Sequence, residues 1–424
     1  MLDPTFQAAL VNIAYLVAAS LFILGLKRQQ TPATARGGNM MAASGMLLAV
    51  VVTLLSQRII TPGAMIIGLV VGGVIGAVLA RRVEMTGMPE LVAAFNGFGG
   101  LASTLVAGAE LARYLVVAEP GPFGGGAAIT LALSILIGTV TFSGSFVAYG
   151  KLSGKVSGNP ISFPGMRVVS FAVLLGVVAM TAVMALDAEA FPAQTGLVVT
   201  AALVLAGLSL VLGVLLVIPI GGADMPVVVA LLNSYSGLAA AATGFVLDNT
   251  VLIVSGTLVG AAGLILTRIM CEAMNRSLTN VLLGGFGGDA VAEVGPAADD
   301  EGRTINETSA EDVAIMLAYA DQVIVVPGYG MAVAQAQHQV RELADLLQKK
   351  GVRVKYAIHP VAGRMPGHMN VLLAEANVSY DVLYEMDEVN GDFNTTDVSL
   401  VIGANDVVNP AARTDQSSPI YGMP

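Results

Sequence analysis

Charged side chains are scarce in this chain of 424 residues. Only 12% of its residues are Asp, Glu, Lys or Arg, whereas 55% are hydrophobic and the mean hydropathy is +0.77. A soluble globular protein usually carries about twice that charged share. The composition therefore excludes a protein that is soluble throughout, and it predicts that most of the chain lies within a membrane.

Cysteine and histidine are almost absent as well. Cys271 is the single cysteine, so no internal disulfide can form, and its place near the end of an apolar run predicts a buried, inert thiol. The first of the three histidines is His338, so the apolar part of the chain offers no histidine for a proton relay. No metal site is expected.

Basic residues are few in the last third of the chain, which is acidic. Residues 1–288 contain 12 Lys or Arg and 10 Asp or Glu, whereas residues 289–424 contain 8 and 20. A segment of this charge repels nucleic acid and offers no basic patch to lipid headgroups. Nucleic acid is therefore not expected as a partner.

Nine long apolar runs fill the first 288 residues. Crossing a bilayer takes roughly 20 apolar residues. The first run has no basic segment before it, so it predicts a retained helix rather than a cleavable signal peptide. The pattern predicts a polytopic bundle of about nine transmembrane helices, in which Gly68, Gly72 and Gly76 favour close helix packing. The runs are 7–26, 39–56, 62–80, 89–112, 127–148, 167–186, 195–218, 225–247 and 250–271.

The loops between these runs differ in charge. With nine spans, alternate loops lie on opposite sides of the membrane. One set of loops holds ten Lys or Arg, whereas the other holds only Arg58 and Arg113. Basic loops remain in the cytoplasm, so the bias predicts an N-terminus outside and a C-terminus inside.

Three polar residues stand out within or beside the apolar runs. Asn96 and Asn233 lie at similar depths from the same side, and Asp224 precedes the eighth run. The two amides either line a hydrated half-channel or only hold helices together by hydrogen bonds. Asp224 is either an exposed loop carboxylate or a titrating group at a channel mouth. The sequence leaves both pairs of alternatives open.

The composition changes at residue 289. Residues 289–312 contain eight acidic residues and one arginine, which is typical of a flexible linker. Residues 313–424 then alternate between strand and helix patterns, which predicts an α/β Rossmann-like, doubly wound domain. The expected strands are 322–327, 352–358, 380–384 and 397–402, and the expected helices are 309–320, 331–350 and 367–376.

A glycine loop follows the first of these strands. Gly328 permits a tight turn, Gly330 lets the backbone approach a pyrophosphate, and the next helix offers free N–H groups to the anion. The second strand ends at His359 without the carboxylate typical of NAD sites, which favours NADP, and Arg364 is suited to hold a phosphate. His359 and His368 are expected to be structural, with a ring beside a nucleotide as the alternative.

Taken together, these residues resemble one family along essentially the whole chain: the beta subunit of bacterial proton-translocating NAD(P) transhydrogenase. Long strings carry the resemblance. They are VEMTGMPELVA at 83–93, GGADMPVVVALLNSYSG at 221–237, MCEAMNRS at 270–277, PGYGMAVAQAQH at 327–338, HPVAGRMPGHMNVLLAEA at 359–376 and VIGANDVVNPAA at 401–412.

The resemblance implies a transhydrogenase that passes hydride between NADH, bound to a separate alpha subunit, and NADP(H), bound to this chain, while protons move inward. No side chain is expected to act as an acid or base at the hydride. The implied residues for the proton path and its coupling are Asn96, Asp224, Asn233 and Arg276. The implied NADP contacts, with the glycine loop included, are Gly328, Tyr329, Gly330, Val361, Ala362, Gly363, Arg364, Met365, Pro366, Gly403, Ala404, Asn405, Asp406 and Val407.

Two departures from the family pattern matter. Some members have histidine where this chain has Asn96, so the proton-carrying histidine is expected on membrane helices of the alpha side. Members also continue beyond the final SPIYGMP with a Lys-Arg-Ser segment that grips the NADP 2′-phosphate, so that grip is not expected within residues 1–424.

The resemblance further implies two alpha–beta units per assembly and a place in the bacterial inner membrane, with the C-terminal domain in the cytoplasm. A dinucleotide-regulated ion channel or transporter without redox activity is the alternative. It would use the same sequence features.

Overall fold

The computed structural model describes residues 4–29, 31–56, 62–83, 87–116, 125–186, 195–273, 277–279, 281, 306–363, 367–415 and 420. The chain forms two compact units. One is Met1–Gly222 with Val228–Leu266, and the other is Ala223–Val227 with Thr267–Pro424. The boundary expected at 288 falls within residues 282–305, which lie outside the described part, and the one expected at 312 falls within the helix α11 (Ala310–Ala318); both stay predictions.

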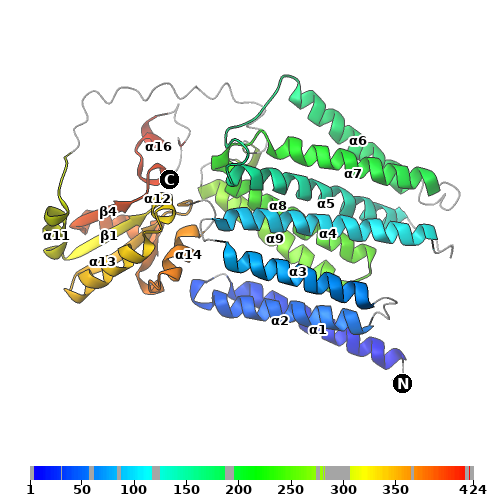
Figure 1. Ribbon diagram of the computed structural model, residues 1–424, viewed down its shortest axis with the longest axis horizontal. Coiled ribbons are helices and arrows are strands. Elements are labelled where there is room, and N and C mark those ends of the chain that lie inside the picture. The colour runs from blue at the N-terminus through cyan, green and yellow to red at the C-terminus, as the bar shows by residue number, and fades with distance from the viewer. Residues whose placement is uncertain are drawn as a thin grey trace. The chain divides into compact units, whose positions relative to one another are not determined.

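Long helices make up the first unit (Figure 1). Each of the nine expected apolar runs forms a helix, because its backbone hydrogen bonds must be satisfied without water. They are α1 (Pro4–Arg28), α2 (Pro32–Ser56), α3 (Pro62–Arg82), α4 (Met88–Val116), α5 (Gly125–Leu152), α6 (Met166–Leu186), α7 (Thr195–Val217), α8 (Met225–Val246) and α9 (Thr250–Ala273).

Eight of these helices are long and apolar enough to cross a membrane within the described residues. The ninth, α3, is not among them, and several side chains at its start lie outside the described part. Close packing was expected at Gly68, Gly72 and Gly76 of α3. A Cβ added at any of them would meet no atom within 4 Å, so they do not pack against another described segment of this chain.

The core of the bundle lies among α4, α5, α6 and α7. Leu131, Met184 and Leu205 are fully buried there. Large apolar side chains elsewhere point outward, as Leu55 and Leu186 do. Such outward-facing apolar residues suit a surface that contacts lipid rather than water. Cys271 is buried, as expected from its place in the sequence.

The second unit contains a small parallel sheet (Figure 1). Its strand order is β3-β2-β1-β4, and the three pairings are all parallel. The strands are β1 (Gln322–Pro327), β2 (Arg353–Ile358), β3 (Leu383–Glu385) and β4 (Val398–Ile402). The helices and turns are α11 (Ala310–Ala318), α12 (Tyr329–Val333), α13 (Gln337–Lys349), α14 (His368–Glu375), η3 (Tyr380–Val382), α15 (Met386–Val389), η4 (Asn390–Thr395), η5 (Asp406–Val408) and α16 (Ala411–Thr414).

The prediction of one continuous helix over 331–350 was wrong. Gln335 has φ +50°, a left-handed conformation that a continuing α-helix does not tolerate. The segment is therefore two helices, α12 and α13. The strand expected over 380–384 is shorter than predicted, because its first residues form the 3-10 turn η3.

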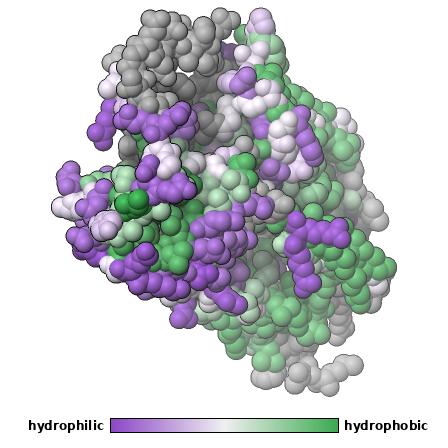
Figure 2. Space-filling view, turned by 60° about the vertical axis from the view of Figure 1, so that its left-hand side comes forward, coloured by the Kyte–Doolittle hydropathy of each residue, from purple (hydrophilic) through white to green (hydrophobic). Residues whose placement is uncertain are grey.

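Every residue of β1 is buried, so this strand forms the centre of the unit. On one face, Ile324, Val326 and Ala357 pack with Val389 of α15. Alternation along a strand turns the neighbouring side chains to the opposite face. In Figure 2, hydrophilic side chains gather over the sheet-containing unit and hydrophobic ones over the long helices.

Candidate functional site

Polar residues recur along one face of α4 and one face of α8. Asn96 and Ser103 lie seven residues apart on α4, and both are buried. Asn233, Ser236 and Thr243 follow one another on α8 at intervals of three and seven residues. Such intervals keep side chains on one helix face. Ser134 of α5 completes the group. We call these six residues the polar seam: Asn96, Ser103, Ser134, Asn233, Ser236 and Thr243.

The structure brings the two amides of the polar seam to the same helical turn. The side-chain nitrogen of Asn96 donates to the carbonyl oxygen of Val229 on α8 at 3.3 Å. In an α-helix that carbonyl also accepts from the N–H four residues later, which belongs to Asn233. Asn96 and Asn233 are therefore neighbours across the α4–α8 contact, as their matching depths suggested.

Hydroxyl groups extend the polar seam away from the two amides. A Cβ at Gly99 would lie 2.7 Å from the Ser236 hydroxyl, so α4 and α8 touch closely there. Farther along, the hydroxyls of Ser134 and Thr243 lie 2.7 Å apart, and Ser134 also donates to the carbonyl of Ser103. A hydroxyl both donates and accepts, so such groups can pass or hold a proton or a water molecule.

The polar seam extends along α8 over a large part of the thickness of a bilayer. Ten residues of α8 separate Asn233 from Thr243. At about 1.5 Å per residue this amounts to about 15 Å, half of a hydrocarbon core of about 30 Å. Sequence reasoning singled out the two asparagines but not Ser134 or Thr243. Single serines and threonines in apolar helices are common, and only the folded contacts distinguish this pair.

Asp224 ends the 3-10 turn η2 (Gly222–Asp224), which leads directly into α8. It is half-buried rather than fully exposed. A carboxylate at a helix N-terminus is stabilised by the helix dipole. Arg276, expected near the exit of the last span, lies outside the described residues.

The second group of expected residues gathers at one edge of the sheet. The loop after β1 and the loop after β4 meet there, because parallel strands end at the same edge. The Gly328 N–H donates to the Ile402 carbonyl at 2.9 Å, and the Gly330 N–H donates to the Gly403 carbonyl at 2.8 Å. Strands β1 and β4 are neighbours, whereas the chain leaves β1 towards β2 on the other side. This is a switch point, where open α/β sheets bind ligands.

This contact changes the explanation of the glycines. We expected the helix after the glycine loop to offer free N–H groups to an anion, but the N–H of Gly330, in the first turn of α12, donates to the other loop, as does that of Gly328. A Cβ at Gly328 would lie 2.2 Å from the Cα of Ala404. Glycine is required at this position because the loop after β4 occupies the space beside it.

Aromatic rings lie beside the loop after β2. The rings of Tyr329 and His368 are 6.1 Å apart and tilted by 47°. Gly363 has φ +107°, and a Cβ there would lie 2.5 Å from Nδ1 of His368. The loop that begins with Val361 and Ala362 therefore folds against His368. Arg364, Met365 and Pro366, which complete it, lie outside the described residues.

His359 has a local structural role. The Val361 N–H donates to its Nδ1 at 3.2 Å, and its carbonyl accepts from the Ala362 N–H. These bonds shape the turn at the end of β2, a structural role of the kind expected for this histidine. Asn405 and Asp406 lie exposed in the loop after β4, where the Asn405 amide donates to the Asp406 carboxylate at 3.2 Å.

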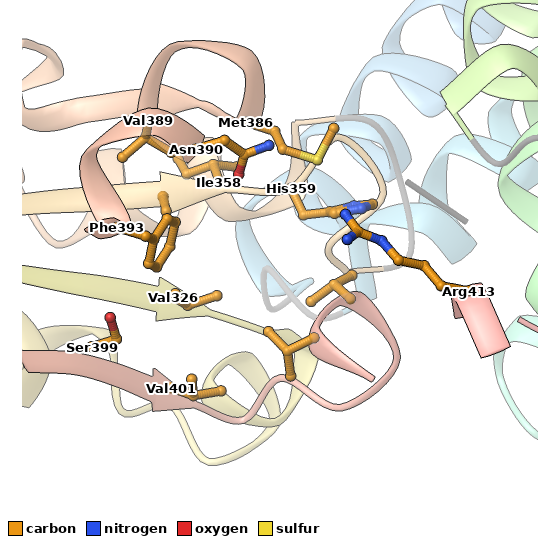
Figure 3. Close-up of a pocket in the computed structure, with 13 residues that line it drawn as sticks. Val326, Ile358, His359, Met386, Val389, Asn390, Phe393, Ser399, Val401 and Arg413 are labelled. Carbon is orange, nitrogen blue, oxygen red and sulfur yellow. The ribbon is translucent and has the colours of Figure 1, made fainter. Parts of the chain in front are cut away.

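A cavity of about 260 Å³ opens beside these loops (Figure 3). Its walls are mostly apolar side chains of β1, β2, β4, α15 and η4, with Val407 and His359 at the edge that carries the loops. Figure 3 shows the Arg413 side chain extending towards His359. Met386, Asn390 and Arg413 also line the cavity and were not singled out from the sequence, where no motif marks them.

Among the described residues, no three His, Cys, Asp or Glu side chains lie close enough to hold a metal ion. The groups gathered at the sheet edge are backbone amides, aromatic rings and amide or carboxylate side chains. These groups recognise organic ligands by shape and hydrogen bonding.

Comparison with known proteins gives a consistent result. A family model described as NAD(P) transhydrogenase beta subunit matches residues 11–424. The chain is 50% identical over 419 residues to the NAD(P) transhydrogenase subunit beta of Rhodospirillum rubrum, covering 98% of this chain and 88% of the relative. A second sequence of the same name, from a designated strain of that organism, matches with the same values.

Proposed function

Since the chain belongs to the family of NAD(P) transhydrogenase beta subunits, we propose that it supplies both the NADP(H) site and the proton path of the enzyme. The resemblance seen in the sequence is thereby confirmed. The chain is a membrane-protein subunit of a proton-translocating transhydrogenase, and it acts with an alpha subunit.

The sheet edge supports the nucleotide part of the proposal. The loops at Gly328–Gly330, Val361–Gly363 and Gly403–Val407 all follow parallel strands, and two of them meet at the switch point. A Rossmann-like domain binds a dinucleotide at this place. Strand β2 ends at Ile358 and is followed by His359, with no carboxylate for a ribose hydroxyl, which favours NADP over NAD.

Direct hydride transfer requires no catalytic side chain. A hydride leaves NADH and joins NADP⁺, giving NAD⁺ and NADPH, so both electrons move together with one hydrogen. No acid or base is needed at that step. The task of this chain is to hold the nicotinamide end facing the alpha subunit and to keep water away. We assign that task to Tyr329 and the exposed loop that contains Asp406.

The polar seam supports the proton part. It is a run of buried or half-buried amides and hydroxyls within helices that are otherwise largely apolar. A polar group in a membrane helix is costly unless it has a partner, and it often marks an ion path. No histidine precedes His338, so the proposal places the proton-carrying histidine on alpha-subunit helices beside Asn96.

Protonation along the polar seam would then alter the surroundings of Asp224. That change would favour one of two states of the NADP(H) site, one that transfers hydride and one that exchanges nucleotide. Arg276 belongs to the same coupling by resemblance. The assembly proposed is a pair of alpha–beta units in the bacterial inner membrane, with the N-terminus outside and the NADP(H) domain in the cytoplasm.

The observation that carries the proposal is the hydrogen bond from Asn96 to the Val229 carbonyl, one turn before Asn233, in a chain whose other unit carries the two loops joined at Gly328 and Gly403. A dinucleotide-regulated channel without redox activity is less favoured, because the family is one of transhydrogenases.

The test is reconstitution of the alpha and beta chains in proteoliposomes with NADPH and an NAD analogue. We expect analogue reduction with proton movement, and Asp224→Asn should slow or uncouple it. Normal turnover and pumping by Asp224→Asn would remove its proposed role. Proton flux without analogue reduction would favour the channel. Selective binding of NADPH over NADH by the beta chain alone in detergent is the companion measurement.

A further inference from the structure

Lys151 is a buried cation at the last turn of α5. Its side chain is 5% exposed. The ammonium nitrogen donates to three carbonyl oxygens: those of Ile218 at 2.6 Å, Ile220 at 2.7 Å and Asn159 at 3.2 Å. All three hydrogens of the ammonium group can therefore be used, which compensates for its loss of water.

Two of these carbonyls follow the end of α7, which finishes at Val217. The last carbonyls of a helix have no partner within it and carry partial negative charge. Lys151, from a different helix, donates to the carbonyl that directly follows α7 and to one two residues farther on, and it brings the opposite charge to this helix end. The contact therefore fixes the end of α7 to the end of α5.

Backbone hydrogen bonds join the same two segments. The Ile161 N–H donates to the Ile218 carbonyl at 3.2 Å, and the Gly222 N–H donates to the Gly158 carbonyl at 2.7 Å. The loop after α5 and the loop after α7 thus run side by side, with Lys151 bonded to both. Gly222 begins the turn η2, which ends at Asp224.

The same helix also touches the region of the first amide. A Cβ at Gly97 would lie 3.2 Å from the Cβ of Ser145 and 3.1 Å from a ring carbon of Phe146, both on α5. Gly97 directly follows Asn96. Six residues, or about 9 Å of helix, separate Ser145 from Lys151. Helix α5 therefore packs beside Asn96 at one level and holds the loop before Asp224 at another.

We propose that Lys151 is a positioning residue for energy coupling, which transmits movement at the α4–α5 contact beside Asn96 to the loop that leads into Asp224. This inference rests on the proposed function, because it assumes that both residues take part in proton-driven hydride transfer. A helix segment packed at Ser145 and hydrogen-bonded through Lys151 is a continuous physical route between two sites. In this role Lys151 neither contacts the nucleotide nor carries the translocated proton.

The chain offers a matched control. Lys155 lies one turn farther on, is exposed, and donates only to the hydroxyl of Tyr149 among the hydrogen bonds described for it. The test compares Lys151→Met, Lys151→Arg and Lys155→Met with the unchanged protein, each as the alpha–beta complex in proteoliposomes. Four quantities are measured: NADPH binding, hydride exchange without net proton movement, the stimulation of NADP⁺ reduction by an imposed proton gradient, and thermal stability.

We expect Lys151→Met to bind NADPH and exchange hydride normally but to lose gradient stimulation about tenfold, the size of a typical coupling effect. Lys151→Arg keeps the charge and donors, so it should retain part of the stimulation, and Lys155→Met should retain all of it. Full stimulation in Lys151→Met would overturn the proposal. So would an equal loss of binding, exchange and thermal stability in both Lys151 variants, since that marks a purely structural role. If the unchanged complex transfers no hydride, the proposed function itself fails, and this inference with it.

Discussion

At the residue scale, the loop after β4 is limited by one backbone conformation. Gly403 has φ +64°, and a Cβ there would lie 2.1 Å from the backbone nitrogen of Met331. Two separate constraints, the left-handed backbone and the lack of space, therefore exclude any side chain. The sequence showed a glycine in a recognisable string, but not that its neighbour in space is the loop after β1.

Gly403→Ala should disturb the proposed NADP(H) site. The left-handed conformation alone costs about 1–2 kcal/mol for a residue with a Cβ, and the contact with Met331 forces the loops apart. We expect at least a tenfold loss of NADPH affinity, equivalent to about 1.4 kcal/mol, measured by calorimetry on the chain in detergent. Gly391→Ala is the control, because a Cβ there meets no atom within 4 Å. Equal affinity in both variants would show that the loop contact does not shape the site.

Tyr356 on β2 is a buried phenol on the face of the sheet towards α13. Its hydroxyl has no hydrogen-bond partner among the described groups. Burial, reinforced by the nearby Asp345 carboxylate, raises the pKa of Tyr356 to about 12, although Arg341 acts in the opposite direction. The phenol therefore stays neutral in the folded chain at pH values where it ionises in an unfolded one.

Tyr356→Phe should leave this unit equally stable or more stable by up to about 1 kcal/mol, because it removes a buried hydroxyl without a partner. The folded pKa lies above the ordinary value of 10.0. The contribution of the neutral Tyr356 to the free energy of unfolding is therefore fully present below pH 10. It is lost as the pH rises towards 12. Protection of β2 amides from hydrogen exchange measures both effects. A marked loss of protection in the phenylalanine variant at neutral pH would contradict the prediction.

At the element scale, α8 is held by different kinds of contact on different sides. It meets α4 through the Asn96 amide, α5 through the Ser134–Thr243 hydroxyl pair, and α9 through small residues. On the α9 side the Ser234 hydroxyl also donates to the Gly260 carbonyl at 2.7 Å. Directional polar contacts therefore fix the register of α8, whereas small residues let α9 approach.

Gly256→Leu should separate α8 from α9. A Cβ at Gly256 would lie 2.4 Å from the backbone nitrogen of Ala241 and 2.7 Å from the Gly237 carbonyl oxygen, so the helices must move apart. We expect reduced thermal stability in detergent and at least tenfold slower proton-driven hydride transfer. Gly207→Leu on α7 is the control, because its Cβ position is open. Unchanged melting of the Gly256 variant would refute the close contact.

At the scale of the whole molecule, the two units have opposite surfaces. The bundle presents apolar side chains such as Leu55 and Leu186, and the sheet-containing unit presents mainly hydrophilic ones (Figure 2). Lipid and water therefore sort the chain into two environments. Charge in the loops of the bundle then decides which side of the membrane receives the second unit.

The orientation can be tested with single cysteines. Ser157 lies in the loop after α5 and Thr250 at the start of α9, and both are exposed. The basic loops predict that Thr250→Cys faces outward and Ser157→Cys faces the cytoplasm. An impermeant maleimide applied to intact cells should label Thr250→Cys alone, and it should label Ser157→Cys only after permeabilisation. The buried native Cys271 keeps the background low. The reverse labelling pattern would invert the proposed topology.

The sequence by itself determined the helices of the bundle and the strands of the sheet. Hydropathy over about 20 residues and short β-branched runs are local properties, and the bounds of β1 and the positions of the long helices followed from them. The ends of several helices did not, since α2 begins at Pro32 and α5 ends at Leu152. Local pattern also missed a local event, the break at Gln335, because nothing in a glutamine signals a left-handed backbone.

Only the tertiary structure decided which groups meet. Periodicity shows which residues share a helix face, but not which partner covers that face. The bond from Lys151 to the Ile218 carbonyl spans 67 positions of the sequence, and that from Asn96 to the Val229 carbonyl spans 133. Hydrogen bonds act over about 3 Å. Their partners are therefore fixed by how helices pack, and packing depends on the shapes of all the side chains in the contact at once.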